Sequence, residues 1–389
     1  MYKRLCNPLK SHSFFLFGAR GTGKTTLMRS LLEKENVFWI DLLDKNEEDR
    51  YARNPSLLYR EVQAKSGTIN WVVIDEVQKV PPLLDTVHRI IETHEFKAPQ
   101  FALTGSSARK LKHGGANLLA GRAFVNSLHP LTLLEYGNDV DLDFVLNWGS
   151  LPKIFSFTND NERQEFLRAY GLTYLKEEVW AEHLVQELEP FRKFLEVSAQ
   201  TNSEIINYSK IARDVNVHEN TVKKYFQILE DTWLGFLLEP YSKSVRKRLR
   251  KNSKFYFFDL GVKRALERTL GQSIIENTYA YGKAFEHFII LECFRLNEYF
   301  KKDFSFSYLR TKDDAEIDLI VDRPGQPTII AEIKSSAIAQ ESDIRTLKAF
   351  NTDIPNSKAI LISRDPHEQI IDGIHFLHWK KAINEIMLI

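Results

Sequence analysis

Residues 14–26 read Phe14-Phe15-Leu16-Phe17-Gly18-Ala19-Arg20-Gly21-Thr22-Gly23-Lys24-Thr25-Thr26. An apolar run typical of a β-strand enters a glycine-rich turn, and a segment of helical character follows. The first and last glycines, the lysine and the next threonine fit G-x-x-x-x-G-K-[ST], the pattern of a loop that binds phosphate. Glycines permit positive φ, so backbone N–H groups can surround an oxyanion, and the helix N-terminus adds donors. The flanking strand and helix argue against a loop of no function.

The loop predicts a site for ATP and Mg²⁺. Lys24 is expected to reach the β- and γ-phosphates, and the Thr25 hydroxyl is expected to hold the magnesium ion. Contacts to the nucleotide are expected from Gly18, Ala19, Arg20, Gly21, Thr22, Gly23, Lys24, Thr25 and Thr26.

The composition is that of an ordinary globular protein. The chain has 389 residues, 43% of them hydrophobic and 27% charged, and its length predicts two or three domains. A net charge of +1 indicates no partner by itself. Cys6 and Cys293 lie far apart without zinc spacing, which favours a reducing compartment. No apolar run reaches the ~20 residues of a membrane span, so we expect a cytoplasmic protein without membrane contact.

Two acids follow another buried strand in the N-terminal part. Strands are expected at 36–42 and 71–76, with a helix at 55–64 between them. Four apolar residues ending in Asp75 and Glu76 are typical of a buried parallel strand, whose carboxyl end is where ligands bind. Asp75 can hold Mg²⁺ through water, and Glu76 can polarise the water that attacks the γ-phosphate. The alternative is a strand that merely ends in solvent-facing acids.

The next expected strand, 100–107, ends in small hydroxyl residues. Ser106 could orient the attacking water or sense the γ-phosphate, as a polar residue does beside the catalytic glutamate of ring-forming ATPases. Simple turn chemistry is the alternative for this residue.

Several motifs occur in one order and together resemble a known family. Besides the loop they are Ile74-Asp75-Glu76-Val77-Gln78-Lys79, Leu103-Thr104-Gly105-Ser106-Ser107, and Leu119-Ala120-Gly121-Arg122 running to Leu128-His129-Pro130. Over essentially the whole chain they closely resemble prokaryotic AAA+-like ATPases of the AAA_14 type with a C-terminal DUF4143 region. The resemblance implies an AAA-type ATPase core and makes Arg122 a candidate to contact phosphate or act as an arginine finger. A finger requires a neighbouring subunit, in a homo-oligomeric ring or dimer, or a closed conformation; a structural salt bridge is the alternative.

We expect an α/β protein of four parts: a P-loop NTPase core with a parallel AAA-type sheet at 1–130, a helical lid or linker at 131–200, a winged helix-turn-helix at 201–275, and a restriction-endonuclease-like α/β domain at 276–389. Residues 208–230 have a helix-turn-helix layout, and the two strand-like runs after them suit a wing.

The winged helix predicts DNA as a partner. Its second helix carries Thr221, Lys223 and Lys224, and seven of the twelve residues at 243–254 are basic. Such residues neutralise phosphates. The alternative is a protein-interaction module with a solvated basic loop. The loop candidates are Arg246, Lys247, Arg248, Arg250 and Lys251.

Acids and a lysine in the last part predict a metal-dependent nuclease site. Asp318 lies in one expected strand, and Glu332 and Lys334 lie in the next, on one face because the side-chain period is two. Asp318 and Glu332 could share one or two Mg²⁺ or Mn²⁺ ions, with Glu286 of the preceding helix completing the cluster. Lys334 would orient the attacking water or stabilise developing charge. The order matches the D…(D/E)-x-K signature of restriction-endonuclease-like nucleases.

Two functions of different class follow from these motifs. The first is an ATP-driven enzyme that binds DNA and cuts it at the metal site. The second is an ATP-switched regulatory or interaction protein whose nuclease-like domain is inactive and only binds nucleic acid or a partner.

Overall fold

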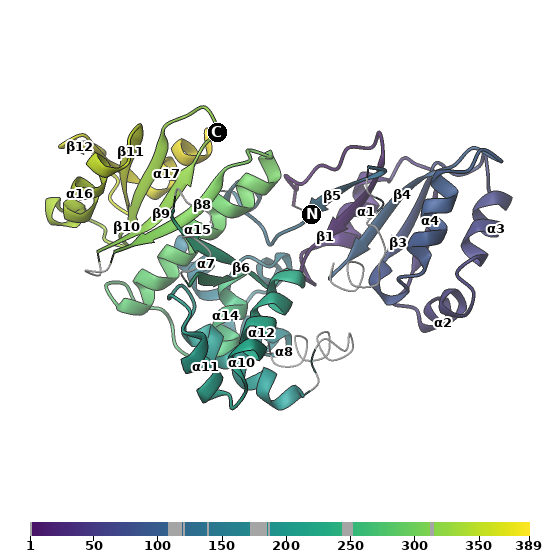
Figure 1. Cartoon of the computed structure of the whole chain (residues 1–389), viewed down its shortest axis with the longest axis horizontal. Helices are drawn as coiled ribbons and strands as arrows, with labels where there is room; N and C mark the ends of the chain where they lie inside the picture. The colour runs from purple at the N-terminus through teal and green to yellow at the C-terminus, as the bar shows by residue number, and fades with distance from the viewer. Residues whose placement is uncertain are drawn as a thin grey trace. The chain divides into compact units, whose positions relative to one another are not determined.

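The fold is that of a computed structural model of the chain (Figure 1). It describes residues 2–107, 119, 121–137, 140–171, 185, 187–242, 252–311 and 315–389. The chain forms two compact units. The first comprises Met1–Leu131 with two short segments, Leu151–Lys153 and Gln227–Leu234, and the remaining residues form the second.

The first unit is built on a five-stranded sheet in which every strand pair is parallel, in the order β2-β3-β4-β1-β5. This confirms the parallel sheet core. The two strands that precede the loop and the acids are buried at every residue, because a parallel sheet is covered on both faces. The elements are β1 (Ser13–Phe17), α1 (Lys24–Leu31), β2 (Val37–Asp41), α2 (Lys45–Arg53), α3 (Leu57–Ala64), β3 (Trp71–Asp75), η1 (Val77–Lys79), α4 (Leu83–Ile91), β4 (Gln100–Gly105) and β5 (Ala123–Ser127).

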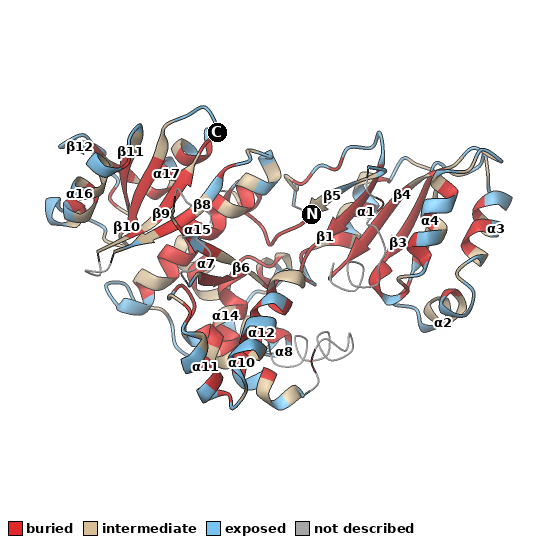
Figure 2. Cartoon of the chain, viewed as in Figure 1, coloured by how far each residue is buried: buried red, intermediate tan, exposed pale blue. Residues whose placement is uncertain are grey.

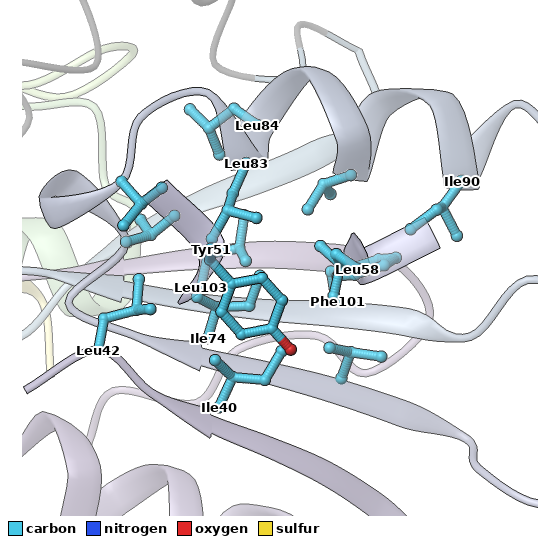
Figure 3. Packing of buried hydrophobic residues seen from close by; sticks show 14 of the residues in the cluster. Ile40, Leu42, Tyr51, Leu58, Ile74, Leu83, Leu84, Ile90, Phe101 and Leu103 are labelled. Atoms are coloured by element: carbon cyan, nitrogen blue, oxygen red, sulfur yellow. The ribbon is translucent and has the colours of Figure 1, made fainter. Parts of the chain in front are cut away.

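An apolar core holds α2, α3 and α4 against this sheet (Figure 3). Helix α2 differs from the sequence expectation, which placed a single helix, at 55–64, between the strands at 36–42 and 71–76. Tyr51 is its one buried residue, and its hydroxyl donates to Glu61 at 2.6 Å. The Asp44 side chain caps the helix by accepting from the Asn46 N–H at 2.9 Å. Capping and one aromatic anchor therefore stabilise a helix that lacks an apolar stripe.

The second unit contains a mixed sheet of eight strands, in the order β12-β13-β11-β10-β9-β8-β6-β7. Its central strands appear as buried ribbons in Figure 2. The strands are β6 (Gly235–Pro240), β7 (Lys254–Phe257), β8 (Ser305–Arg310), β9 (Glu316–Asp322), β10 (Thr328–Ile333), β11 (Ser357–Ser363), β12 (Gln369–Ile371) and β13 (Ile374–His378). The helices after Leu131 are α6 (Leu133–Tyr136), α7 (Leu142–Trp148), η2 (Pro152–Ser156), α8 (Asp160–Ala169), α10 (Leu188–Gln200), α11 (Tyr208–Asp214), α12 (Glu219–Asp231), α14 (Leu260–Glu267), α15 (Tyr279–Phe300), η4 (Glu341–Ile344), α16 (Arg345–Asp353) and α17 (Trp379–Met387). The start of η2 and the end of α12 belong to the first unit.

The hairpin expected as a wing and the strands expected in the nuclease-like domain belong to one sheet. Strand β6 pairs antiparallel with β7 and parallel with β8, where Glu239 lies opposite Ser307 and Pro240 opposite Tyr308. The helix-turn-helix elements α11 and α12 precede this hairpin in the same order as predicted. Side chains of β7 can therefore take part in chemistry on the strands beyond β8.

Two further sequence observations have structural counterparts. Cys6 and Cys293 are free thiols, and both are buried. Within the described ranges, no helix is long and apolar enough to cross a membrane.

A glycine decides how closely two helices of the second unit approach. A Cβ built on Gly261 would stand 2.1 Å from the carbonyl oxygen of Trp148, at the contact of α14 with α7. We expect Gly261→Ala to lower the free energy of unfolding by about 1–3 kcal/mol, because the two helices must separate. Thermal melts of both proteins measure the loss.

The matched control is Gly271→Ala. A Cβ at Gly271 meets nothing within 4 Å, so its melting temperature should stay close to that of the wild type. An equal effect of both substitutions would refute the close-packing explanation.

Candidate functional site

The loop after β1 is shaped by close backbone contacts. Gly18 admits no side chain, because a Cβ there would lie 2.2 Å from the Leu128 carbonyl oxygen. Gly23 adopts a left-handed conformation, φ 96°, where α1 begins. The Thr22 hydroxyl donates to the Ala19 carbonyl oxygen at 2.8 Å and tightens the turn. The loop thus has the compact form that its glycine spacing predicts.

Lys24 lies inside this loop and is buried. Its Nζ donates to the Gly18 carbonyl oxygen at 2.8 Å and stands 3.9 Å from Glu76 Oε1. The ammonium group is therefore between the loop backbone and the acid at the end of β3.

The Thr25 hydroxyl and Asp75 come together as a set of oxygen ligands. Thr25 Oγ1 donates to Asp75 Oδ2 at 2.7 Å, and the Thr104 hydroxyl donates to the other carboxylate oxygen. Thr104 Oγ1 also accepts from the Glu76 N–H at 3.1 Å, which ties β3 to β4 at their carboxyl ends. A hydroxyl and a carboxylate are the ligand types that Mg²⁺ prefers, so these residues fit the ion.

Glu76 has the strained backbone and the surroundings of a functional residue. Its φ is 58°, the left-handed region, where a non-glycine residue is uncommon. Its Oε2 accepts from Gln78 Nε2 at 2.5 Å and from the Ser106 hydroxyl at 3.2 Å. Burial alone would raise the pKa of Glu76, but Lys24 and these two donors together hold it below its usual value. The side chain is therefore a carboxylate at neutral pH.

Gln78 is a residue that the sequence reasoning missed. Its Nε2 bridges Glu76 Oε2 and the Ser106 hydroxyl, which is 3.0 Å away. The only sequence signal is its position two residues after Glu76. In the β3–η1 turn that spacing brings its amide back onto the carboxylate.

The N-terminal segment before β1 was also missed. Arg4 donates from one nitrogen to the Thr22 carbonyl oxygen and from another to the His129 carbonyl oxygen, both at 2.6 Å. A cavity of about 710 Å³ opens beside it. It is lined by Tyr2, Lys3, Arg4, Leu5, Cys6, Asn7, Gly23, Thr26, Leu27, Ser30, Leu31, Leu131 and Pro152.

Arg122 forms an ion pair with a residue outside this group. It precedes β5 and forms an ion pair with Glu92, which follows α4. This is the salt bridge that the sequence left as the alternative to an arginine finger.

The predicted DNA contacts on α12 are exposed lysines. Lys223 and Lys224 are both exposed, and Thr221 is half-buried. Lys223 pairs with Glu219 one turn earlier at 2.7 Å and lies over the Tyr208 ring. The basic residues Arg246, Lys247, Arg248, Arg250 and Lys251 lie outside the described residues.

The second unit brings together the acids expected in the nuclease-like site. Asp318 on β9 and Glu332 on β10 stand opposite each other, since the antiparallel register pairs Leu319 with Ala331 next to them. Asp318 Oδ2 accepts from the Ile333 N–H at 2.8 Å. Burial, and then the charges of Glu332 and Glu286, raise the pKa of Asp318 well above its usual value.

Only one of the two carboxylate oxygens of Glu332 has a hydrogen-bond partner among the described residues. Its Oε1 accepts from Lys334 Nζ at 2.7 Å, while its buried Oε2 has no hydrogen-bond partner among the described residues. Burial raises the pKa of Glu332 in spite of Lys334. Asp318 and Glu332 therefore have only one lysine between them, and one Glu332 oxygen has no described hydrogen-bond partner. Such a pair of carboxylates fits a divalent cation.

Glu286 was expected to bind the metal, but lysine and tyrosine side chains bind it in the structure. It lies near Asp318, but it is bound by Lys254 Nζ at 3.5 Å, by Lys283 Nζ at 3.0 Å and by the Tyr256 hydroxyl at 2.7 Å. These groups more than offset burial and hold the pKa of Glu286 below its usual value.

The expected metal set of Glu286, Asp318 and Glu332 is accordingly not seen. In the parts of the chain that the structure describes, no three or more His, Cys, Asp or Glu side chains are grouped to hold a metal ion. Glu286 does not join Asp318 and Glu332, because its carboxylate oxygens already accept from two lysines and a tyrosine.

The first unit resembles an AAA-type P-loop domain in its parallel sheet and in its glycine-rich loop. Residues 10–137 match the family model described as "AAA domain". Residues 139–273 and 281–381 match two models described as domains of unknown function, DUF8612 and DUF4143.

Several proteins are similar to this chain over most of their length. Uncharacterized protein Rv2008c of Mycobacterium tuberculosis is 25% identical over 90% of this chain and 76% of that protein. Uncharacterized protein MJ1637 of Methanocaldococcus jannaschii is 23% identical over 95% and 84%. Among solved structures, the Walker-type ATPase paby2304 of Pyrococcus abyssi is similar with a TM-score of 0.46 and 14% identity, over 67% of this chain and 92% of that one.

The bridging role of Thr104 can be tested directly. We expect Thr104→Val to weaken Mg²⁺-dependent ATP binding about tenfold, because Asp75 loses one of its two hydroxyl donors and the Glu76 N–H loses its acceptor. Titration of a fluorescent ATP analogue, with Mg²⁺ and with EDTA, measures the effect.

Thr86→Val is the matched control. Thr86 on α4 is half-buried and donates only to the Pro55 carbonyl oxygen at 3.3 Å. Its affinity for Mg²⁺·ATP should equal that of the wild type. If Thr104→Val also left affinity unchanged, Thr104 would have no role in the site.

Proposed function

We propose that the first unit binds and hydrolyses Mg²⁺·ATP. The observation that carries this proposal is the hydrogen-bonded series from Thr25 to Asp75, Thr104 and Glu76, next to Lys24. Lys24 would bind the β- and γ-phosphates, and Thr25 with Asp75 would hold the magnesium ion, whose charge offsets that of the phosphates.

Glu76 would act as the base toward the attacking water. A carboxylate near a cation, with its pKa below the usual value, is ionised at neutral pH and can accept a hydrogen bond from water. Ser106 and Gln78 both hold the same oxygen of Glu76, so Oε1 is the oxygen on the Lys24 side. The cavity beside Gly23 and Thr26 has room for the base and sugar of the nucleotide.

Substitutions in the loop and at β3 should separate binding from turnover. We expect Lys24→Ala to weaken Mg²⁺·ATP binding at least about tenfold, and Glu76→Gln to bind ATP but hydrolyse it about 100-fold more slowly. Nucleotide titration and release of inorganic phosphate measure the two effects.

Lys34→Ala, an exposed lysine of the same unit, is the control and should match the wild type in both assays. Wild-type protein that binds no Mg²⁺·ATP would contradict the proposal.

We further propose that the second unit binds DNA and cleaves it with a divalent metal. The exposed Lys223 and Lys224 on α12, ahead of the β6–β7 hairpin, support a phosphate-binding surface. Asp318 and Glu332 would hold Mg²⁺ or Mn²⁺, which would lower the pKa of an attacking water. Lys334, paired with Glu332, would orient that water or stabilise charge on the phosphate.

Cleavage can be measured with plasmid and single-stranded DNA. With Mn²⁺ or Mg²⁺, with and without ATP, we expect the wild type to nick plasmid and Asp318→Ala and Lys334→Ala to lose at least about 100-fold in rate. The control is Asp353→Ala, an exposed acid at the end of α16.

Cleavage that persists in both variants would mean that it arises elsewhere. No cleavage by the wild type under any of these conditions would favour the second function, an ATP-switched interaction protein with an inactive nuclease-like domain.

A further inference from the structure

Lys254 is a buried cation in the middle of the acid cluster, although the sequence counts it among the basic residues at 243–254 expected to contact DNA. It begins β7, and its side chain is 2% exposed. A lysine is almost never fully buried unless it is paired. Here the cost of removing an ammonium group from water is offset by two carboxylates on other elements.

Those two carboxylates belong to Glu316 on β9 and Glu286 on α15. Lys254 Nζ lies 2.5 Å from Glu316 Oε1 and 3.5 Å from Glu286 Oε1. The Tyr256 hydroxyl, two residues along β7, donates to the same Glu286 oxygen at 2.7 Å. Strand β7 therefore supplies two donors to the acids through one face of its pleat.

Asp318 and Glu332 form no ion pair with Lys254, and their hydrogen-bond partners are of other kinds. Asp318 accepts from a backbone N–H, and Glu332 has Lys334 on one oxygen and no described partner on the other, which is buried. Lys283 and Arg310 add to the charge around Glu286 and Glu316, at 3.0 Å and 3.8 Å. The direct ion pairs of Lys254, Lys283 and Arg310 are thus with Glu286 and Glu316, while the Lys254 charge acts on Asp318 without an ion pair and counters the rise of its pKa.

We propose that the Lys254 ammonium group is a built-in cation of this cluster, which neutralises Glu286 and Glu316 and leaves one divalent-ion position, between Asp318 and Glu332. The inference rests on the proposed metal site and defines its stoichiometry. It also assigns Glu286 to Lys254 and removes it from the metal ligands that the sequence predicts.

Counting bound Mn²⁺ tests the inference without any measurement of cleavage. In the full chain without nucleotide, electron paramagnetic resonance of free Mn²⁺ and calorimetric titration should show one ion per chain that Asp318→Asn removes. In Lys254→Met, Glu286 and Glu316 lose the cation that they share and keep only Lys283 and Arg310, so we expect a second Mn²⁺ to bind. Lys254→Arg keeps the charge and should stay at one ion.

Glu286→Gln gives a second test should Lys254→Met fail to fold. We expect it to change the Mn²⁺ dissociation constant less than threefold, because Glu286 is bound to Lys254 and not to the metal. A loss of tenfold or more would make Glu286 a metal ligand and overturn the inference. So would a folded Lys254→Met protein that binds the same number of ions as the wild type.

Failure of the inference and failure of the proposed function give different results. Mn²⁺ bound as expected without DNA cleavage would end the nuclease proposal and leave the role of Lys254 standing. Cleavage that depends on Asp318, together with an unchanged ion count in Lys254→Met, would end the inference alone.

Discussion

The hydrogen bond between Thr25 and Asp75 depends on the parallel order of the first sheet. Thr25 lies in the first turn of the helix after β1, and Asp75 ends β3, 50 residues later. They meet because β4 lies between β1 and β3 and all three strands end at the same edge. Thr104, from the intervening strand, completes the link. Loop, acids and Ser106 converge only while this strand order is kept.

The acid cluster of the second unit obeys a different constraint, the cost of burying charge. Four neighbouring carboxylates, three on strands and Glu286 on α15, cannot all remain ionised without cations. The chain meets this need with Lys254 on β7 and with Lys334, which directly follows β10. Pairing of β6 with β8 brings the hairpin into the sheet, so a segment expected to contact DNA also builds the acid cluster.

The sequence predicted those parts of the structure that spacing and periodicity along the chain define. The strand, loop and helix around Gly18 and Lys24 were predictable, since spacing along the chain alone defines them. The pairing of Asp318 with Glu332 followed from two adjacent strands. Gln78 and Lys254 were not predictable, because each acts on a group that a turn or a distant strand brings near. Helix α2 was missed because a cap and Tyr51 replace the apolar stripe.

The sequence by itself predicted a P-loop domain of AAA type, which the match of residues 10–137 supports, and a later segment with acids and a lysine expected at a metal site. Local spacing and hydrophobic period suffice for that, since they depend on neighbours along the chain. Only the tertiary structure decided which charges face each other. In the structure, Arg122 pairs with Glu92, and Lys254 pairs with Glu286 and Glu316. The energy of a buried charge depends on its neighbours in space, which sheet order sets and sequence distance does not.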